Sequence, residues 1–194
     1  MMKIENTLAR LEKVCIGVAG AGGLGSNATM ALIRAGVRNV VIADYDSVEK
    51  SNLNRQYFFA DQIGMPKVEA LKINALKVNP DCSITTHHVK VTPDNAVELF
   101  SGCDLIIEAF DKADQKIMLI EVLMEQLPDI PLVVGSGMGG WGKSDEIRCK
   151  QLGNVMLCGD FETEADESNP PLAPRVGIVA NMQANEALRL IMGF

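Results

Sequence analysis

Long hydrophobic runs and concentrated positive charge are both missing from this chain. No apolar stretch approaches the roughly 20 residues that a membrane-spanning helix needs, so we expect no membrane-spanning segment. Acidic residues outnumber Lys and Arg by 25 to 18, and the formal net charge is −7. Because nucleic-acid binding relies on basic surface that neutralises phosphates, this charge disfavours a general nucleic-acid-binding role. Residues 1–6 also lack the pattern of a signal peptide, and we expect a cytoplasmic protein.

Closely spaced cysteine pairs are absent as well. The chain has five cysteines, an odd number, and no two of them form a Cys-x-x-Cys motif. Such a set predicts reduced thiols that pack as small apolar residues, and it predicts neither a disulfide framework nor a zinc knuckle. The cysteines are Cys15, Cys82, Cys103, Cys149 and Cys158.

Short apolar segments alternate with helical patterns up to residue 134. Apolar runs that stop at glycine or polar residues indicate buried strands, whereas apolar residues spaced three or four apart indicate helices. Strands that alternate with helices predict an α/β, Rossmann-like and mostly parallel sheet with helices on both faces. The expected strands are 14–19, 40–43, 84–89, 105–107 and 132–134, and the expected helices are 24–35, 66–78, 92–100 and 113–127.

The C-terminal part departs from this alternation. Segments 147–150 and 155–157 predict a short antiparallel C-terminal extension of the sheet. Residues 160–174 are rich in acidic residues and proline and predict a mobile surface loop, and a final helix is expected over 177–192. The sequence contains no internal repeat and no linker-like composition. We therefore expect a single nucleotide-binding domain over residues 1–194.

A glycine-rich turn follows the first expected strand and opens the first expected helix. Gly20, Gly22 and Gly25 allow a tight turn and let the backbone approach a phosphate at the positive end of the helix. Alone this turn is a weak signal, because a purely structural turn can have the same composition. Asp44 ends the next strand, where a carboxylate can bind ribose hydroxyls, although a strand-end turn would also use an aspartate. Together, the glycine turn after the first expected strand and Asp44 at the end of the next strand predict a nucleotide site.

A polar loop replaces the return into a helix that an ordinary dehydrogenase would show. Residues 51–56 are too rich in side-chain donors for a simple turn. Arg55 offers a planar guanidinium to phosphate, and Lys67 offers a mobile positive charge. A solvated surface position is the alternative for any single Arg or Lys. It is less satisfactory here, because both residues follow the nucleotide strand in a chain with little basic charge.

Asp111 follows the fourth expected strand. An aspartate there can cap a helix, but open parallel sheets bind ligands at the carboxyl ends of their strands, where Asp44 and the turn 135–137 also fall. A carboxylate that faces nucleotide phosphates is a reasonable magnesium ligand. His87 and His88 are expected on the third strand and have no partner that indicates a general base. The pattern predicts attack on a phosphate of ATP, with cations and a metal neutralising the transferring group.

Together these motifs resemble those of the ThiF/MoeB/HesA family, which is related to the ubiquitin-activating enzymes. The likeness extends from about Val14 to the last helix, and the Asn-Leu-Asn-Arg-Gln block is highly specific. Within the family the chain is most similar to the short form of ThiF, in its length and in two C-terminal segments. The residues that carry the resemblance are 20–25, 44–46, 51–56, Lys67, 158–160, 173–177 and 183–186.

The resemblance implies an enzyme that uses ATP and Mg²⁺ to adenylate the C-terminal glycine of a small ubiquitin-like sulfur carrier. The carrier would end in Gly-Gly and would be the ThiS protein of thiamine biosynthesis, and the enzyme would be a homodimer. By position, Asp44 would hold the ribose and Asp111 the magnesium, while Arg55, Lys67 and Asn52 would serve the phosphates. The expected catalytic residues are Arg55, Lys67 and Asp111, and the expected nucleotide-binding residues are Gly20, Gly22, Gly25, Asp44, Asn52, Asn54, Arg55, Gln56 and Lys67.

Several positions depart from the family pattern. The two Cys-x-x-Cys pairs that bind zinc in longer relatives are missing, so we expect no structural zinc. The amino-terminal Arg-Tyr-x-Arg-Gln is also missing, and Arg10 is a poor substitute, which leaves open whether a partner subunit assists the site. Lys112 stands where the family has Asn and Lys116 where it has Arg, and both keep the site basic. We expect Cys158 to pack in the interior rather than to form a covalent link to the carrier.

Three other interpretations are compatible with the sequence. The same chemistry could act on another ubiquitin-like carrier or on a tRNA-linked carboxylate, although the acidic composition counts against tRNA. An NAD(P)-dependent dehydrogenase would need an acid or base for hydride transfer and would leave Arg55 and Lys67 without a function. A catalytically inert module would bind nucleotide only for stability.

Overall fold

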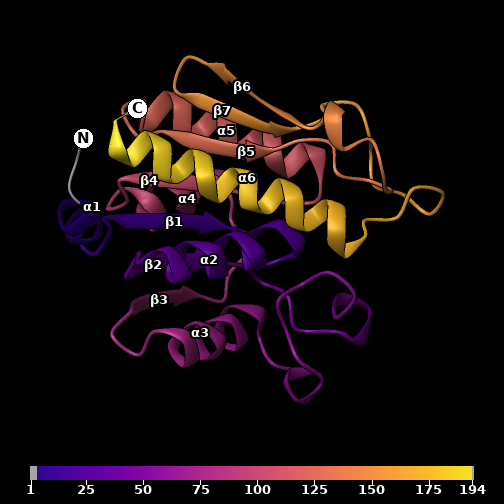
Figure 1. The fold of residues 1–194 in the computed structure, drawn as a ribbon, viewed down its shortest axis with the longest axis horizontal. Coiled ribbons are helices and arrows are strands. Elements are labelled where there is room, and N and C mark those ends of the chain that lie inside the picture. The colour runs from indigo at the N-terminus through magenta and orange to yellow at the C-terminus, as the bar shows by residue number, and fades with distance from the viewer. Residues whose placement is uncertain (1–3, 194) are drawn as a thin grey trace.

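The computed structural model describes residues 4–193, which form a seven-stranded sheet between two layers of helices (Figure 1). The strands are β1 (Cys15–Ala19), β2 (Asn39–Ala43), β3 (Ser83–His87), β4 (Leu105–Glu108), β5 (Leu132–Gly135), β6 (Arg148–Leu152) and β7 (Val155–Gly159). Their order in the sheet is β3-β2-β1-β4-β5-β7-β6. Neighbouring strands pair in parallel except β6 and β7, which form an antiparallel pair at one edge.

The helices cover the sheet on both faces. They are α1 (Ile4–Leu11), α2 (Gly23–Ala35), α3 (Lys67–Val78), α4 (Pro93–Phe100), α5 (Ala113–Gln126) and α6 (Ala173–Met192), with short 3-10 turns η1 (Lys50–Asn52), η2 (Ala60–Gln62) and η3 (Ser144–Glu146). One core packs α2, α3 and α6 against the sheet, and a second core packs α4 and α5 against the opposite face (Figure 1). Among the described helices, none combines the length and the apolar character that crossing a membrane requires.

The central strands are buried because apolar residues occupy consecutive positions. All of β4 is buried, as is β1 from Ile16 to Ala19. Parallel strands that helices cover on both sides show this continuous apolar pattern instead of alternation. In the pairing of β1 with β2 and β4, Ala19 lies beside Ala43 and Glu108. The carboxyl ends of three strands therefore meet at one edge of the sheet.

The expected α/β fold is confirmed, and three details differ from what the sequence predicts: helix α1, the start of the final helix and the position of His88. Helix α1 was not expected. The final helix begins at Ala173 rather than at residue 177, because Pro174 fits a first helical turn, where no backbone N–H is required. Strands β6 and β7 form the expected antiparallel C-terminal extension, and β7 joins it to the main sheet by pairing in parallel with β5. His88 lies beyond the end of β3, whereas His87 is its last residue.

A buried ion pair fastens the start of α6 to the end of β7. Arg175 donates hydrogen bonds to the carboxylate of Asp160 and to the carbonyl oxygen of Gly142. Asp160 also accepts hydrogen bonds from Glu162 and Thr163, at 2.6–2.9 Å. Although burial opposes ionisation, these hydrogen bonds lower the pKa of Asp160 to about 2. Arg175 therefore connects the start of α6 to two other segments, the loop at Gly142 and the end of β7 at Asp160.

Replacement of Arg175 tests how much this ion pair contributes to the free energy of unfolding. Arg175→Met should lower the free energy of unfolding by roughly 3–5 kcal/mol, because it leaves a buried carboxylate without its cation. Arg38→Met is the control, since it removes a surface pair with Glu12 and should cost under about 1 kcal/mol. Urea denaturation measures both. Equal costs for the two variants would contradict the prediction.

The same contact predicts an acid dependence of stability. The pKa of Asp160 in the folded protein, about 2, lies below the value of about 3.9 expected for an unfolded chain. The native protein should therefore have this stabilisation in full above about pH 4 and lose it as the pH falls toward 2. Arg175→Met should show a smaller loss over that interval in pH-dependent urea denaturation.

Candidate functional site

A cavity of about 640 Å³ opens at the edge where the parallel strands end. Its wall combines the turn after β1, the loops after β2, β4 and β5, the first turn of α5 and the segment before α6. The volume is within the range of ordinary small-ligand sites. The wall includes these residues expected from the sequence: Gly20, Gly22, Asp44, Arg55, Gln56, Lys67 and Asp111.

The glycine turn is held by close backbone packing. Gly20 has φ +98°, and its N–H donates to the carbonyl oxygen of Ala43 at 2.8 Å. A Cβ on Gly25 would lie 1.8 Å from the carbonyl oxygen of Gly20, so Gly25 is required for the helix to approach the turn. Gly22 borders open space, since a Cβ there would meet its nearest neighbour at 3.9 Å. No side chain caps α2 at Gly22, which leaves the first N–H groups of that helix available to an anion.

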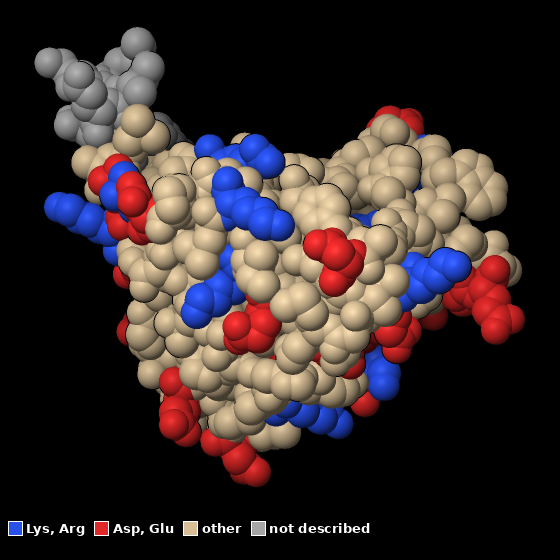
Figure 2. All heavy atoms as spheres, turned by 90° about the horizontal axis from the view of Figure 1, so that it is seen from below, with Lys and Arg blue, Asp and Glu red and all other residues tan. Residues whose placement is uncertain are grey.

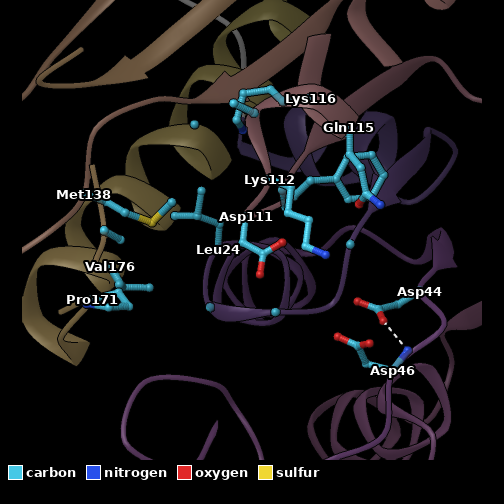
Figure 3. A pocket seen from close by; sticks show the side chains of 18 of the residues that line it. Leu24, Asp44, Asp46, Asp111, Lys112, Gln115, Lys116, Met138, Pro171 and Val176 are labelled. Carbon is cyan, nitrogen blue, oxygen red and sulfur yellow. Dashed lines mark hydrogen bonds between the residues drawn. The ribbon is translucent and has the colours of Figure 1, made fainter. Parts of the chain in front are cut away.

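Asp44 connects the glycine turn to the loop after β2. Its carboxylate accepts hydrogen bonds from the backbone N–H of Ala21 at 2.6 Å and of Asp46 at 2.7 Å, the latter drawn in Figure 3. Burial raises the pKa of Asp44, and the two N–H donors oppose that rise. A carboxylate has about four acceptor sites, so Asp44 can accept further hydrogen bonds from ligand hydroxyls.

Lys67 is a buried cation at the start of α3. Its ammonium donates to Oδ2 of Asp46 at 2.8 Å, and the residue is only 6% exposed. Both residues belong to the cavity wall. An ammonium has three donors, so Lys67 can keep Asp46 as a partner and also bind an anion in the cavity. Asp46 was not expected in the site, although its place two residues after Asp44 was an available signal.

Arg55 and Gln56 reach the cavity from the loop after η1. The Arg55 guanidinium donates to the carbonyl oxygen of Ser51 at 3.1 Å and to the side chain of Asn54 at 2.8 Å. Both bonds use the same nitrogen, Nη1, and a guanidinium has five donors in total. Oε1 of Gln56 is buried and has no hydrogen-bond partner within residues 4–193. A buried acceptor without a partner is costly, which indicates a ligand donor or a water at this position.

Three expected residues lie outside the cavity wall. Gly25 serves the packing of α2 against the glycine turn. The side chain of Asn52 accepts a hydrogen bond from the backbone N–H of Glu49 at 3.0 Å and so closes η1. Asn54 accepts a hydrogen bond from Arg55. In this structure the three residues shape the loops behind the cavity.

Asp111 and Lys112 precede the first turn of α5. Both residues are exposed, and their side chains extend into the cavity (Figure 3). Within the described part of the chain, no cluster of three or more metal-ligating side chains occurs. Magnesium that binds together with nucleotide phosphates needs only one or two carboxylates, because the phosphates supply further oxygens. Asp111 fits that kind of site and does not form a metal centre of its own.

A second buried ion pair supports the loop that carries Asp111. Glu108 is fully buried at the end of β4, where its carboxylate pairs with Lys116 and accepts a hydrogen bond from the Phe110 N–H at 2.7 Å. Burial raises the pKa of Glu108, and Lys116 opposes that rise. Lys116 was expected to contribute positive charge to the site, but the carboxylate of Glu108 neutralises that charge. An acidic residue at the end of an apolar strand was the signal for Glu108.

The remaining candidates, Cys158 and His88, are not part of the cavity wall. Cys158 is fully buried on β7, with its sulfur 3.3 Å from that of Cys149. Burial raises the pKa of both thiols, and a protonated buried thiol is a poor nucleophile. Nε2 of His88 lies 2.9 Å from the carbonyl oxygen of Tyr45. These positions do not supply a nucleophile or a base to the cavity.

Comparison with known proteins finds relatives along nearly the whole chain. Adenylyltransferase and sulfurtransferase UBA4 of Candida glabrata is 30% identical over 191 residues, which are 95% of this chain and 44% of UBA4. Adenylyltransferase and sulfurtransferase MOCS3 of Aedes aegypti is also 30% identical, over 95% of this chain and 43% of MOCS3. The chain thus spans less than half the length of these curated relatives.

Solved structures share the fold. The tRNA N6-threonylcarbamoyladenosine dehydratase TcdA of E. coli, solved in complex with AMP and with ATP, has a TM-score of 0.88 at 25% identity, over 97% of this chain and 90% of TcdA. E. coli MccB, solved with ATP, has a TM-score of 0.74 at 18% identity, over 95% of this chain and 58% of MccB. The profile of the ThiF family matches residues 2–194. The chain therefore belongs to the ThiF family.

Proposed function

We propose that this chain binds ATP in the cavity and transfers AMP to the C-terminal carboxylate of a small ubiquitin-like carrier protein. The observation that carries the proposal is the convergence of the glycine turn, Asp44, Arg55 and Lys67 on one cavity in a ThiF-family chain. The adenylyltransferase names of UBA4 and MOCS3 support the activity, and the AMP and ATP complexes of TcdA support the nucleotide. These relatives give no support to a hydride-transferring dehydrogenase.

The proposed reaction requires no general base. A carboxylate oxygen of the carrier, already ionised at neutral pH, attacks the α-phosphorus of ATP. The bond from that phosphorus to the oxygen of the β-phosphate breaks, and its electron pair leaves with pyrophosphate. Because the attacking and attacked groups are both negative, Arg55 and Lys67 would lower their repulsion. Asp111 would hold magnesium, which neutralises charge on the leaving pyrophosphate when bound.

The other wall residues would position the nucleotide. The ribose hydroxyls would donate hydrogen bonds to Asp44, and the N–H groups at the start of α2 would donate to phosphate oxygens. Gln56 would accept a hydrogen bond through its unpaired Oε1. Asn52 and Asn54 would act indirectly, by fixing the loop that presents Arg55.

We infer that the partner is a sulfur carrier of the ThiS type, which ends in Gly-Gly. The names of UBA4 and MOCS3 join adenylyl transfer with sulfur transfer, which favours a sulfur carrier. The assignments to thiamine biosynthesis and to a homodimer rest on the resemblance to short-form ThiF, whereas the cytoplasmic location rests on the lack of a signal-peptide pattern in residues 1–6.

A tRNA-linked carboxylate is the second candidate substrate. TcdA, a tRNA N6-threonylcarbamoyladenosine dehydratase, matches over 97% of this chain and 90% of its own length. The net charge of −7 weighs against tRNA. On the face seen in Figure 2, Lys and Arg side chains are interspersed with Asp and Glu and do not form one basic patch. Binding to a phosphate backbone depends on basic surface, so the net negative charge leads us to favour a carrier protein.

Replacement of Arg55 tests the proposed function. With a carrier that ends in Gly-Gly, Arg55→Ala should slow the exchange of labelled pyrophosphate into ATP by at least about 100-fold, the order expected for loss of a transition-state cation. The label recovered in ATP over time is the measurement. Arg38→Ala is the control, because Arg38 pairs with Glu12 outside the cavity wall and should leave exchange unchanged.

The same assay separates the candidate substrates. Exchange that depends on the carrier supports the proposal, whereas exchange that depends on tRNA supports the second candidate. No exchange by the native chain with either substrate, or full exchange by Arg55→Ala, would overturn the proposed function.

Replacement of Asp111 tests the magnesium site. Asp111→Asn should raise the magnesium concentration for half-maximal exchange by about tenfold or more, because a neutral amide replaces a charged ligand. A titration of the exchange rate with magnesium at fixed ATP measures this change. Asp114→Asn is the matched control, since Asp114 is an exposed carboxylate in the first turn of α5, three residues from Asp111 and outside the cavity wall. If Asp111→Asn reaches half-maximal exchange at the same magnesium concentration as the native chain, Asp111 is not a magnesium ligand.

A further inference from the structure

Lys112 occupies a position where helix physics disfavours lysine. It is the N-cap residue of α5, in an extended conformation, and it makes no side-chain cap hydrogen bond. Ser, Thr, Asp and Asn are preferred at this position because their side-chain oxygens accept hydrogen bonds from helix N–H groups, whereas an ammonium has only donors. A positive charge at this end also opposes the helix dipole. Lys112 therefore destabilises the start of α5 in two ways unless an anion is close.

The Lys112 side chain extends into the cavity without a partner of its own. Figure 3 shows it beside Asp111, in the cavity wall. Two other lysines of the wall are already matched, Lys67 by Asp46 and Lys116 by Glu108. No ion pair of Lys112 occurs among residues 4–193. Its ammonium is therefore available to an anionic ligand.

The charge of the cavity wall depends on Lys112. When Glu108 is counted with its partner Lys116, the wall has equal numbers of cationic and carboxylate side chains. Without Lys112 the wall would be net negative, and it would repel a triphosphate. The cations are Arg55, Lys67, Lys90, Lys112 and Lys116, and the carboxylates are Asp44, Asp46, Glu108, Asp111 and Glu164.

Two observations away from Lys112 indicate a ligand in the same space. The first turn of α2 also borders this cavity, and no side chain caps it. Gln56 is a polar wall residue that is only 9% exposed, and its buried Oε1 has no partner in the described residues. Unmatched polar groups thus stand on more than one side of the cavity, as a polar and anionic nucleotide would require.

We propose that Lys112 binds phosphate oxygens of ATP and determines the preference of the site for the triphosphate over the uncharged nucleoside. The inference rests on the proposed function and extends it to a residue where this chain departs from the family pattern. Lysine at this N-cap lowers the stability of α5, and the ligand phosphates offset that loss when they bind. Stability and nucleotide affinity therefore change in opposite directions at this position.

Lys112→Asn tests the inference because it removes the charge and supplies a good N-cap. Without nucleotide, the variant should unfold at a temperature about 2–4 °C higher than the native chain. Its affinity for ATP should fall about tenfold or more, the effect of losing a hydrogen bond to a charged group. Its affinity for adenosine should stay unchanged. Calorimetric unfolding gives the first value, and equilibrium dialysis of the full chain with labelled ATP or adenosine gives the others.

Two variants serve as controls. Lys112→Arg keeps the charge and should retain the affinity for ATP. Lys150→Asn removes an exposed lysine of β6 that is not in the cavity wall, and it should leave both affinities unchanged. Native affinity of Lys112→Asn for ATP, or a parallel loss of stability and adenosine binding, would overturn the inference.

The outcomes distinguish this inference from the proposed function. If the native chain does not bind ATP, both fail together. If the native chain binds ATP and catalyses pyrophosphate exchange while Lys112→Asn has native ATP affinity, only the role of Lys112 fails. Weaker ATP binding with higher thermal stability supports the inference.

Discussion

The parallel pairing of β1 with β4 is the constraint on which the candidate site depends. Because Ala19 lies beside Glu108, the glycine turn and the loop that carries Asp111 leave the sheet side by side. A Cβ on Gly20 would lie 2.8 Å from the carbonyl oxygen of Ala109, so the two loops can approach this closely only with a glycine. Parallel strands bring such loops to one edge, where open α/β sheets bind their ligands. A change of register would move the glycine turn away from Asp111.

The most buried lysines of the cavity wall form ion pairs with carboxylates. Lys67 and Lys116 are the lysines of the wall with the least exposed side chains, and each has a carboxylate partner. Burial of an unpaired charge is costly, so these partners stabilise the cavity without a ligand. Arg55 and Lys112 are less buried, and water can solvate them. The wall thus combines a stable set of paired charges with cations that a phosphate can reach.

Much of the fold and part of the site could be predicted from local patterns. Apolar runs that stop at glycine or polar residues identified the strands, and the rule that ligands bind at strand ends placed Asp44, Asp111 and the turn 135–137 at one edge of the sheet. The last helix begins earlier than the sequence predicts, because Pro174 belongs to the first turn of that helix and not to the preceding loop. The resemblance assigns Asn52 to the phosphates, and this role stays a prediction, because the side-chain oxygen of Asn52 closes its own loop. Short-range patterns do not show which way a side chain turns.

By itself the sequence determined the order of strands and helices, the glycine turn and the chemical types of the residues that follow each strand. These features depend on backbone preference and on apolar periodicity, which act over a few residues. Only the tertiary structure decided the partners of the charged groups. Glu108 meets Lys116, and Asp160 meets Arg175 across a loop, because sheet pairing and helix packing bring separate segments together. Such contacts arise from the burial of a shared core, so no local stretch of sequence specifies them.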